Sequence, residues 1–433
     1  MFILIGAVVL SLPAASASGS RLPLIDSLFT STSAICVTGL TVVDTGGTFS
    51  GLGEWVILLL FQAGGLGIMT FSTFFAVLMG RKIGFSETDT IKGSMDRNSV
   101  YGLERLLYYI LGLTIAIEAA GTAALFFRWK AVSSWTAGES LRQALFHSVS
   151  GFCNAGFSLF KDSLTGYRAD PVVNFTMMSL IVLGGLGFVV LMEIAGLFVK
   201  KHPARRLSLQ SKIAITTSAI LIAAGALLIF FLEKGNTLKN LGTGEGLMAS
   251  AFHSVAARTA GFNTLPVSSM SMPTQMVIMF LMFVGASPGS TGGGIKTCTL
   301  AVIAASVYCI LKDRKKTSLL GRSITSQIVR EATVIIFLAL AWVFAATTLL
   351  AFLERNNPAV GGNFMNVFFE VVSAFGTVGL STGITSSLSW GGKLCIIATM
   401  FAGRIGPLTL ALAVAFKDKS ERYFYPEENI MVG

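Results

Sequence analysis

The chain has 433 residues, of which 53% are hydrophobic and only 12% charged, and its formal net charge is +10. A soluble domain usually carries about twice that share of charged residues, so the composition excludes an ordinary soluble protein. Several apolar runs reach the roughly 20 residues that a bilayer-spanning helix needs, which predicts an all-α polytopic membrane protein. These runs are 54–79, 103–127, 171–199, 213–232, 329–353 and 393–416.

The first twelve residues are apolar, and residues 15–17 resemble the cleavage site of a signal peptide. A signal peptide begins with a positively charged region, whereas the first basic residue here is Arg21. We therefore interpret this segment as the end of a first transmembrane helix whose start lies outside the given chain. A cleaved signal peptide is the alternative.

Four stretches of the chain resemble one another, and each runs from a phenylalanine to a glycine that precedes a large apolar residue. The phenylalanine lies ten residues before the glycine in three copies and nine before it in the third. The copies are Phe29 to Gly39-Leu40, Phe146 to Gly156-Phe157, Phe252 to Gly261-Phe262 and Phe369 to Gly379-Leu380. The apolar segments that lead into the glycines are half a membrane span long: 24–36, 141–153, 247–258 and 364–375.

This pattern predicts a unit of outer helix, half-helix, extended loop and inner helix. Four such units account for nearly the whole chain and leave no room for a soluble domain. They are repeat 1 (1–80), repeat 2 (81–201), repeat 3 (202–316) and repeat 4 (317–418), followed by a C-terminal tail (419–433).

Four glycine-ended loops in one membrane chain predict a pseudo-fourfold, potassium-channel-like pore. Half-helices around an axis point the negative ends of their dipoles at its centre, which favours a cation. Loop carbonyls then replace the hydration shell of the ion, and glycine permits backbone conformations closed to other residues. Gly-aromatic pairs also serve close helix packing, but four pairs at matching repeat positions favour the pore.

The positive charge lies mostly in connections between helices. Of 32 Lys and Arg residues, 19 fall in segments 81–105, 200–212, 312–330 and 417–422. The positive-inside rule places these segments in the cytoplasm, so the glycine loops enter from the extracellular side of the cell membrane. This distribution argues against a nucleic-acid partner. The five cysteines form no Cys-x-x-Cys pair, which makes a metal or redox role unlikely.

Histidine and serine recur at matching positions of the repeats. His147 and His253 are equivalent, which raises the possibility of a metal site. Thr30 and Glu370 take that position in the other repeats, so we expect a surface position on the half-helix instead. Ser33, Ser150 and Ser373 also match, and we expect them to bind the half-helix backbone.

The four loops carry motifs that resemble the superfamily of potassium transporters that includes bacterial Trk and Ktr membrane subunits and plant HKT proteins. The resemblance covers the whole chain and is strongest to the membrane subunit of Ktr systems, the KtrB type. The motifs are Ser33-Ala-Ile-Cys-Val-Thr-Gly-Leu-Thr-Val-Val-Asp-Thr-Gly46, Asn154-Ala-Gly-Phe-Ser158, Arg258-Thr-Ala-Gly-Phe-Asn263, Ser373-Ala-Phe-Gly-Thr-Val-Gly-Leu380 and Gly403-Arg-Ile-Gly-Pro-Leu-Thr409.

The resemblance implies a selectivity filter that binds potassium, mainly through backbone carbonyls. Its residues would be Val37, Thr38, Gly39, Asn154, Ala155, Gly156, Thr259, Ala260, Gly261, Thr377, Val378 and Gly379. In this family a serine at the first filter glycine goes with sodium permeation, so Gly39 implies potassium. Sodium dependence stays open.

Residues 285–297 interrupt the third inner helix with a glycine-rich segment that almost matches a phosphate-binding P-loop. The match fails because Ile295 separates Gly294 from Lys296 and no soluble strand–helix context surrounds it. By resemblance this segment is an intramembrane gating loop, and the predicted gate comprises Gly289, Gly292, Gly293, Gly294, Lys296 and Arg404. Arg404 lies within an apolar run and needs a wet path or a partner such as Glu370.

Two other classes of function compete with a potassium pore. A sodium- or proton-coupled symporter usually shows two-fold inverted repeats, which four parallel repeats disfavour. An intramembrane enzyme would need a convergent nucleophile and base, for example at Ser287 or Ser290, and none is evident.

The resemblance also implies the partners. It implies a homodimer in membrane lipid, with one pore per protomer, on a cytosolic nucleotide-binding ring of the RCK type (KtrA-like). The chain shows no nucleotide-binding fold of its own, so we expect no cofactor here beyond potassium, or sodium, and nucleotide only on the regulatory partner.

Overall fold

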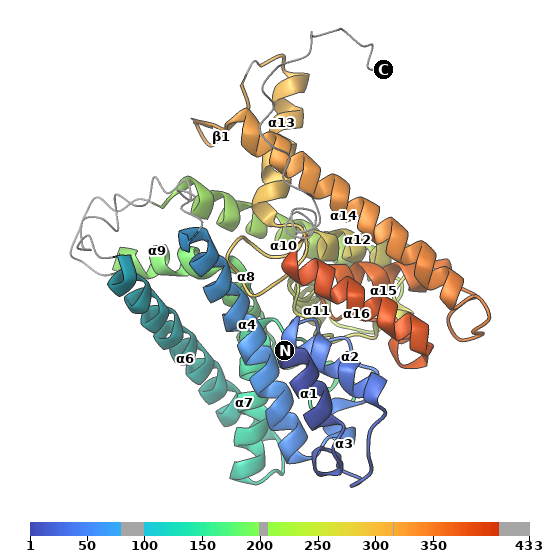
Figure 1. The fold of residues 1–433 in the computed structure, drawn as a ribbon. Helices are drawn as coiled ribbons and strands as arrows, with labels where there is room; N and C mark the ends of the chain where they lie inside the picture. Colours follow the sequence, from blue (N-terminus) through green and yellow to red (C-terminus); the bar gives the residue numbers. More distant parts are fainter. Residues whose placement is uncertain (79–98, 199–206, 315, 407–433) are drawn as a thin grey trace.

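The structure is a computed structural model that describes residues 1–78, 99–198, 207–314 and 316–406 (Figure 1). Several predictions fall outside these residues. They concern all or most of the basic segments 81–105, 200–212 and 417–422, the end of the run 393–416, and the tail 419–433.

The described elements form four successive groups, each with a short helix that leads into a glycine loop. The first contains α1 (Phe2–Leu10), η1 (Pro13–Ala15), α2 (Leu24–Ile35), α3 (Thr45–Thr48) and α4 (Gly51–Leu78). The second contains α6 (Ser99–Val132), α7 (Ala137–Cys153), η2 (Thr165–Tyr167), α8 (Pro171–Leu186) and α9 (Phe188–Phe198). The third contains α10 (Leu209–Glu233), α11 (Thr243–Ala256), η3 (Val267–Ser269), α12 (Met272–Phe283) and α13 (Thr297–Leu311). The fourth contains β1 (Ser318–Leu319), β2 (Arg322–Ser323), α14 (Ser326–Leu353), α15 (Phe364–Gly376), η4 (Thr385–Ser387) and α16 (Trp390–Ile405). The boundaries predicted at 80, 201, 316 and 418 stay predictions.

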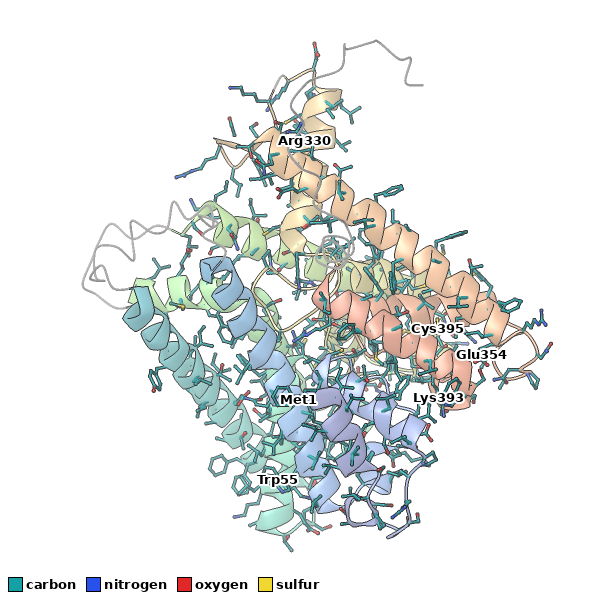
Figure 2. The ribbon with its side chains drawn as sticks, in the orientation of Figure 1. Met1, Trp55, Arg330, Glu354, Lys393 and Cys395 are labelled. Atoms are coloured by element: carbon teal, nitrogen blue, oxygen red, sulfur yellow. The ribbon has the colours of Figure 1, made fainter. Side chains whose placement is uncertain are left out.

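Within the described residues, three helices are long and apolar enough to cross a membrane alone, within α6, α10 and α14. Figure 2 shows α14 running from Arg330 at its upper end to Glu354 at its lower end. The hairpin β1–β2 projects from the same upper end as α13 (Figure 1).

The second inner helix is not continuous, although its apolar run 171–199 predicted one span. α8 and α9 meet at an angle of 105°. Gly187 between them has φ +89°, and a Cβ there would lie 2.7 Å from the carbonyl oxygen of Pro288. The chain bends at this glycine because the segment between α12 and α13 packs against it.

The short helices α2, α7, α11 and α15 match the predicted half-helices. α7 and α11 begin four residues before the predicted starts. The start of α7 follows from a capping box, in which the Thr136 hydroxyl accepts from the Glu139 N–H and the Glu139 carboxylate accepts from the Thr136 N–H. The Thr136 N–H lowers the pKa of the exposed Glu139 carboxyl, since it stabilises the charged form.

Buried carboxylates join outer helices to inner helices in the third and fourth groups. Glu233 ends α10 and accepts from the N–H and hydroxyl of Ser271, the N-cap of α12, at 2.8 and 2.7 Å. Glu354 follows α14 and accepts from the N–H and hydroxyl of Ser389, the N-cap of α16, at 2.9 and 2.6 Å. A carboxylate at a helix N-terminus is favoured by the helix dipole, so both joints fix where the inner helices begin.

The repeated apolar residues of the sequence form the packing around the glycine loops. The phenylalanines that begin the copies and the large residues that follow the glycines are at most 2% exposed: Phe29, Leu40, Phe146, Phe157, Phe252, Phe262, Phe369 and Leu380. The sequence repeat therefore reflects equivalent packing positions, which buried apolar residues occupy around each of the four loops.

Inner helices approach the short helices closely at glycines. A Cβ at Gly64 on α4 would overlap the carbonyl oxygen of Ile35 at the end of α2, with the Ile35 Cα only 3.0 Å away. Gly184 and Gly403 lie in the same way against Phe152 and Phe375. Only a residue without a side chain permits this distance.

We predict that Gly64→Ala destabilises the protein by about 1–3 kcal/mol, because the backbone of Ile35 cannot move away without displacing the loop. Thermal unfolding of the purified protein measures this change. Gly112→Ala on α6 is the matched control. Nothing lies within 4 Å of its Cβ position, so better helix propensity should stabilise it by up to ~1 kcal/mol. Equal unfolding temperatures for the two variants would contradict the packing argument.

Candidate functional site

The four glycine loops share one backbone conformation. φ is +84° at Gly39, +72° at Gly156, +73° at Gly261 and +93° at Gly379, all in the left-handed region. The residues two positions earlier are also left-handed, with φ between +50° and +74°, although none is glycine: Val37, Asn154, Thr259 and Thr377. Left-handed backbone is uncommon in such residues, so surrounding contacts impose it.

The four glycines close a ring. A Cβ at Gly39 would lie 2.8 Å from the Cα of Gly156, and a Cβ at Gly156 would lie 3.3 Å from the Cα of Gly261. A Cβ at Gly261 would lie 3.2 Å from the Cα of Gly379, and one at Gly379 would lie 3.1 Å from the Cα of Gly39. The repeats therefore follow one another around a single axis, in chain order.

The carbonyl group before each glycine borders the next repeat. The oxygens of Ala155, Ala260, Val378 and Thr38 lie beside Gly39, Gly156, Gly261 and Gly379, respectively. The loops fold back on their helices, since the N–H groups of Thr38, Ala155 and Val378 donate to carbonyls five residues earlier at 2.8–2.9 Å. All twelve residues predicted for the filter thus belong to one ring of four loops. Glycine marked the ring in the sequence, whereas nothing in the sequence marked the left-handed residues before it.

Two of the three matched serines bind the loops and not the half-helix backbone, which corrects their predicted role, and the buried hydroxyl of Ser33 has no hydrogen-bond partner in the described part of the chain. The Ser150 hydroxyl donates to the carbonyl of Phe157 at 2.8 Å, and the Ser373 hydroxyl accepts from the N–H of Gly379 at 3.1 Å. Both partners lie six or seven residues ahead, beyond the left-handed turn. These serines therefore tie the loop to the helix that precedes it.

The predicted surface position of His147 and His253 is wrong, because both side chains are fully buried. His147 Nε2 lies 3.0 Å from the Ser158 hydroxyl, and His253 Nε2 accepts from the Leu265 N–H at 3.1 Å. The equivalent Glu370 accepts from the hydroxyls of Ser381 and Thr385. These side chains join each short helix to the segment after its glycine. No group of three metal-ligating residues occurs in the described part of the chain.

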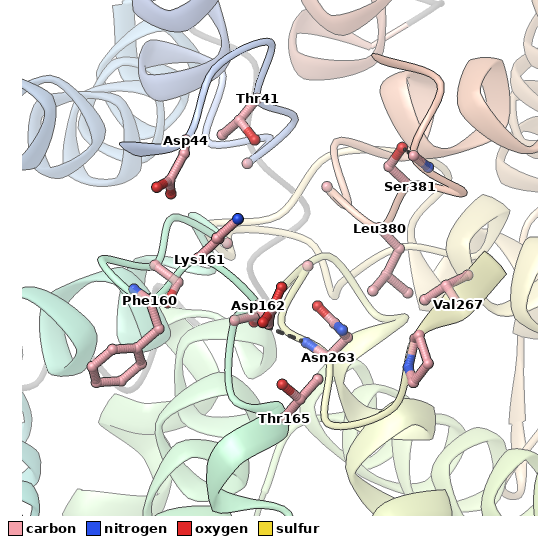
Figure 3. Close-up of a pocket in the computed structure, with 18 of the residues that line it drawn as sticks. Thr41, Asp44, Phe160, Lys161, Asp162, Thr165, Asn263, Val267, Leu380 and Ser381 are labelled. Carbon is pink, nitrogen blue, oxygen red and sulfur yellow. Dashed lines mark hydrogen bonds between the residues drawn. The ribbon is translucent and has the colours of Figure 1, made fainter. Parts of the chain in front are cut away.

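A cavity of about 520 Å³ lies over the ring, with all four ring glycines in its lining. Figure 3 shows Asp44, Lys161 and Asp162 on one side and Leu380 and Val267 on the other. The lining residues follow the glycines in the chain, so the cavity is an open vestibule on one side of the ring.

The predicted gating segment lies on the opposite side of the ring. Gly293 donates its N–H to the Thr377 hydroxyl at 2.9 Å. The carbonyl of Gly289 accepts from the N–H of Phe188 at 3.2 Å, and Gly294 donates to the carbonyl of Gly403 at 3.3 Å. Gly289 and Gly294 have φ of +72° and +66°. The segment is thus a defined loop that hydrogen bonds hold to repeats 2 and 4.

Two cations hold the carbonyls of this loop. Lys296 Nζ donates to the carbonyl of Gly292 at 2.6 Å. Arg404, only 7% exposed, donates to the carbonyls of Thr291 and Gly64, the latter at 2.7 Å. The alternative ion pair between Arg404 and Glu370 is wrong, since Glu370 is bound by Ser381 and Thr385.

Two further acids within apolar segments accept hydrogen bonds. Glu118 on α6 accepts from Gln62 Nε2 at 3.3 Å, and Glu193 on α9 accepts from the N–H of Ser208 at 3.0 Å. All five cysteines are free.

A second fourfold pattern, which the sequence reasoning missed, runs along the inner helices. It comprises Gly64-Gly-Leu-Gly67, Gly184-Gly-Leu-Gly187, Gly285-Ala-Ser-Pro288 and Gly403-Arg-Ile-Gly406. The second residue of this pattern is glycine or alanine in the first three repeats, whereas in the fourth it is Arg404. A search for repeats at a period of 100–120 residues would have found this pattern and singled out Arg404.

Comparisons with known proteins agree with this arrangement. A family model for TrkH, described as a cation transport protein, matches residues 3–425. The Ktr system potassium uptake protein B of Bacillus subtilis is 39% identical and is matched over 100% of this chain and 94% of its own. The potassium/sodium uptake protein NtpJ of Enterococcus hirae is 36% identical and is matched over 100% and 95%.

A solved structure matches the fold. The crystal structure of the potassium transporter TrkH from Vibrio parahaemolyticus superposes with a TM-score of 0.69, covering 96% of this chain and 84% of that one. The two chains are 20% identical, so this likeness concerns the fold alone. It agrees with the predicted fold class, a helical membrane protein, in which the short hairpin β1–β2 is the only β-sheet among the described residues.

Proposed function

Because the chain belongs to the TrkH family of cation transport proteins, we propose that it carries potassium ions across the cell membrane through the ring of four glycine loops. The family match confirms the resemblance that the sequence motifs indicated. The observation that carries the proposal is the closed ring itself, in which a Cβ on any of Gly39, Gly156, Gly261 and Gly379 would lie within 3.3 Å of the next glycine's Cα.

The geometry of the ring suits a cation that sheds water. The carbonyl oxygens before each glycine supply ligands in place of hydration water, and fixed loops prevent them from collapsing on one another. Four short helices end at the loops, so the negative ends of their dipoles add to the attraction. Asp44 and Asp162 outnumber the single cation Lys161 in the vestibule lining, so the net charge there favours cations over anions.

Potassium is the proposed ion. The relatives are named as potassium uptake and potassium/sodium uptake proteins, and they are transporters, so we propose no enzymatic activity for this chain. Gly39 at the first loop, in place of serine, favours potassium over sodium. A sodium- or proton-coupled potassium symporter, or a sodium-permeable pore, is the alternative, because one relative's name includes sodium. Uptake that requires a sodium gradient would favour the alternative.

The loop 285–297 is the proposed gate. It lies across the ring from the vestibule, and its backbone is held by Arg404, Lys296 and Thr377. A buried guanidinium on the ion path also repels cations. In the closed state both the loop and Arg404 therefore obstruct the path, and opening requires the loop to withdraw.

The vestibule side is proposed to face the outside of the cell. The hairpin β1–β2 and the predicted cytoplasmic segment 312–330 lie at the upper end of Figure 1, and the predicted positive-inside orientation places that end in the cytoplasm. Ions would enter at the vestibule, lose water in the ring and meet the gate before the cytoplasm.

The proposed assembly is a homodimer of membrane subunits, with a KtrA-like, RCK-type nucleotide-binding ring on the cytoplasmic side. The name of the Bacillus subtilis relative as one protein of a Ktr system supports a working partner. Chemical crosslinking in native membranes tests the dimer, and a product that stays monomeric at every reagent concentration would contradict it.

We predict that Gly39→Ala lowers potassium uptake by ~10-fold or more. Left-handed backbone costs an alanine roughly 1–2 kcal/mol, and its Cβ would lie 2.5 Å from the carbonyl oxygen of Ala155. A barrier raised by 1.4 kcal/mol slows a rate ~10-fold. Growth of a potassium-uptake-deficient bacterium at low potassium measures the loss.

The matched control is Gly166→Ala, an exposed glycine near the vestibule with nothing within 4 Å of its Cβ position. It should support growth like the unchanged protein, with equal amounts of each variant in the membrane. Normal growth with Gly39→Ala would contradict the proposal that ions pass through the ring.

We predict that deletion of Gly292–Gly294 raises flux, because the shortened loop no longer reaches Thr377 and Arg404. Rubidium influx into proteoliposomes measures the change. The double variant with Gly39→Ala should lose the gain, which shows that the added flux passes through the ring. Unchanged flux after the deletion would count against a gate.

A further inference from the structure

A buried arginine behind the third loop has no partner among the described residues. Arg258 follows the C-cap of α11, and its side chain is only 7% exposed. Its Nε is buried without a hydrogen-bond acceptor, and its other side-chain nitrogens donate to none of the described residues. The ion pairs in the described part of the chain do not include it either. Its positive charge is therefore uncompensated.

Other arginines of the described chain show what such a charge ordinarily requires. Arg404 is equally buried, but it donates to two carbonyls. Arg128, Arg142 and Arg168 are more exposed, and each pairs with a carboxylate. A buried charge without a partner costs several kcal/mol, so Arg258 requires a partner that the described residues do not supply.

Arg258 lines a small cavity between α8, α10 and α11. Ser218 on α10 also lines it, and this serine is 3% exposed with a hydroxyl that has no hydrogen-bond partner in the described chain. An unpaired guanidinium and an unpaired hydroxyl thus meet at one cavity. The rest of the lining is apolar: Ile181, Val182, Gly185, Leu186, Ile222 and Val255.

The chemistry of this cavity matches an anion. A guanidinium only donates hydrogen bonds, and a serine hydroxyl donates one. A cation is repelled by the guanidinium, and a water molecule satisfies the donors but leaves the charge uncompensated. The cavity of about 10 Å³ has room for one water-sized group, which favours a halide over a larger anion.

We propose that Arg258 and Ser218 bind one small monovalent anion of the chloride class. The guanidinium supplies the opposite charge, the hydroxyl donates a further hydrogen bond, and apolar side chains from α8, α10 and α11 surround the ion. A negatively charged group has two sources here, a free halide and the phosphate of an anionic lipid. Half-buried Val182, Leu186 and Ile222 leave the cavity near the protein surface, within reach of either source.

The site goes beyond the proposed function but has a consequence for it. Thr259, one of the residues predicted for the filter, directly follows Arg258 in the chain. If potassium passes the ring as proposed, an uncompensated positive charge behind Thr259 would repel it, and the bound anion cancels that repulsion. The anion also joins α8 of the second group to α10 and α11 of the third.

Thermal unfolding of the purified full chain tests the site, in dodecyl maltoside micelles, which contain no phosphate. Potassium chloride is replaced stepwise by potassium gluconate, whose anion is too large for the cavity, so that potassium and ionic strength stay constant. We expect the unfolding temperature to rise with chloride and to level off as the site fills. At ten times its Kd, chloride should raise the ratio of folded to unfolded protein roughly tenfold.

Two variants and a matched control assign this effect to the cavity. Arg258→Gln removes the charge, so its unfolding temperature should not depend on chloride. Ser218→Ala removes one hydrogen bond to the anion and should raise the Kd for chloride roughly tenfold. The control is Ser140→Ala, because Ser140 is also a buried serine without a partner in the described chain but lies on α7, outside the cavity lining. It should respond to chloride as the unchanged protein does.

Phosphatidylglycerol added to the micelles distinguishes the two sources of the anionic group. Stabilisation that requires this lipid, and that Arg258→Gln abolishes, would support the site with a lipid phosphate in place of a halide. An unfolding temperature that neither chloride nor this lipid raises would overturn the proposal. Arg258→Gln that responds as the unchanged protein, or Ser218→Ala that responds as Ser140→Ala, would overturn it as well.

Discussion

The rest of the structure depends on the close approach of four glycines, Gly39, Gly156, Gly261 and Gly379. They lie so close together that there is no room for a Cβ on any of them. A Cβ at Gly39 or Gly379 would meet the neighbouring loop at about 3 Å or less. A ring this tight forms only if four loops from distant parts of the chain arrive at the same axis with the same backbone. The serines and buried polar residues behind the loops are therefore placed to repeat one conformation four times, since Ser150 and Ser373 each bind backbone beyond the left-handed turn.

Contacts between the helices position the four loops around the axis. Gly64, Gly184 and Gly403 let inner helices pack on the carbonyls at the ends of the short helices, which sets the distance of each loop from the axis. Glu233 and Glu354 fix where two inner helices start, because each carboxylate binds the first N–H groups of the next helix. Membrane helices lack a strong hydrophobic drive to associate in lipid, so close glycine contacts and buried hydrogen bonds position the four repeats.

Much of this arrangement was predictable from the sequence, because the repeat concerns packing positions as well as the ring. The glycines, the half-helices and the broken third inner helix follow from apolar length and from repetition. The bend at Gly187 was not predictable, since its cause is a loop 100 residues later in the chain. The burial of His147 and His253 was missed for the same reason: their partners lie after the loop and become neighbours only when the loop folds back. The sequence identified Arg404 as a charged residue within an apolar run, where a charge is energetically costly. Its hydrogen-bond partners, the carbonyls of Thr291 and Gly64, could not be predicted because only the tertiary structure brings them close.

In the proposed function the ring, the vestibule and the loop 285–297 form one ion path, and the central claim of that proposal is selectivity for potassium at the ring. Rubidium uptake into proteoliposomes tests that claim most directly, with potassium and sodium as competitors and with both the unchanged protein and the variant that lacks Gly292–Gly294. The account predicts uptake that potassium blocks and sodium blocks only weakly, in at least the trimmed variant. Equal block by both ions, or no rubidium uptake by either protein, would contradict it.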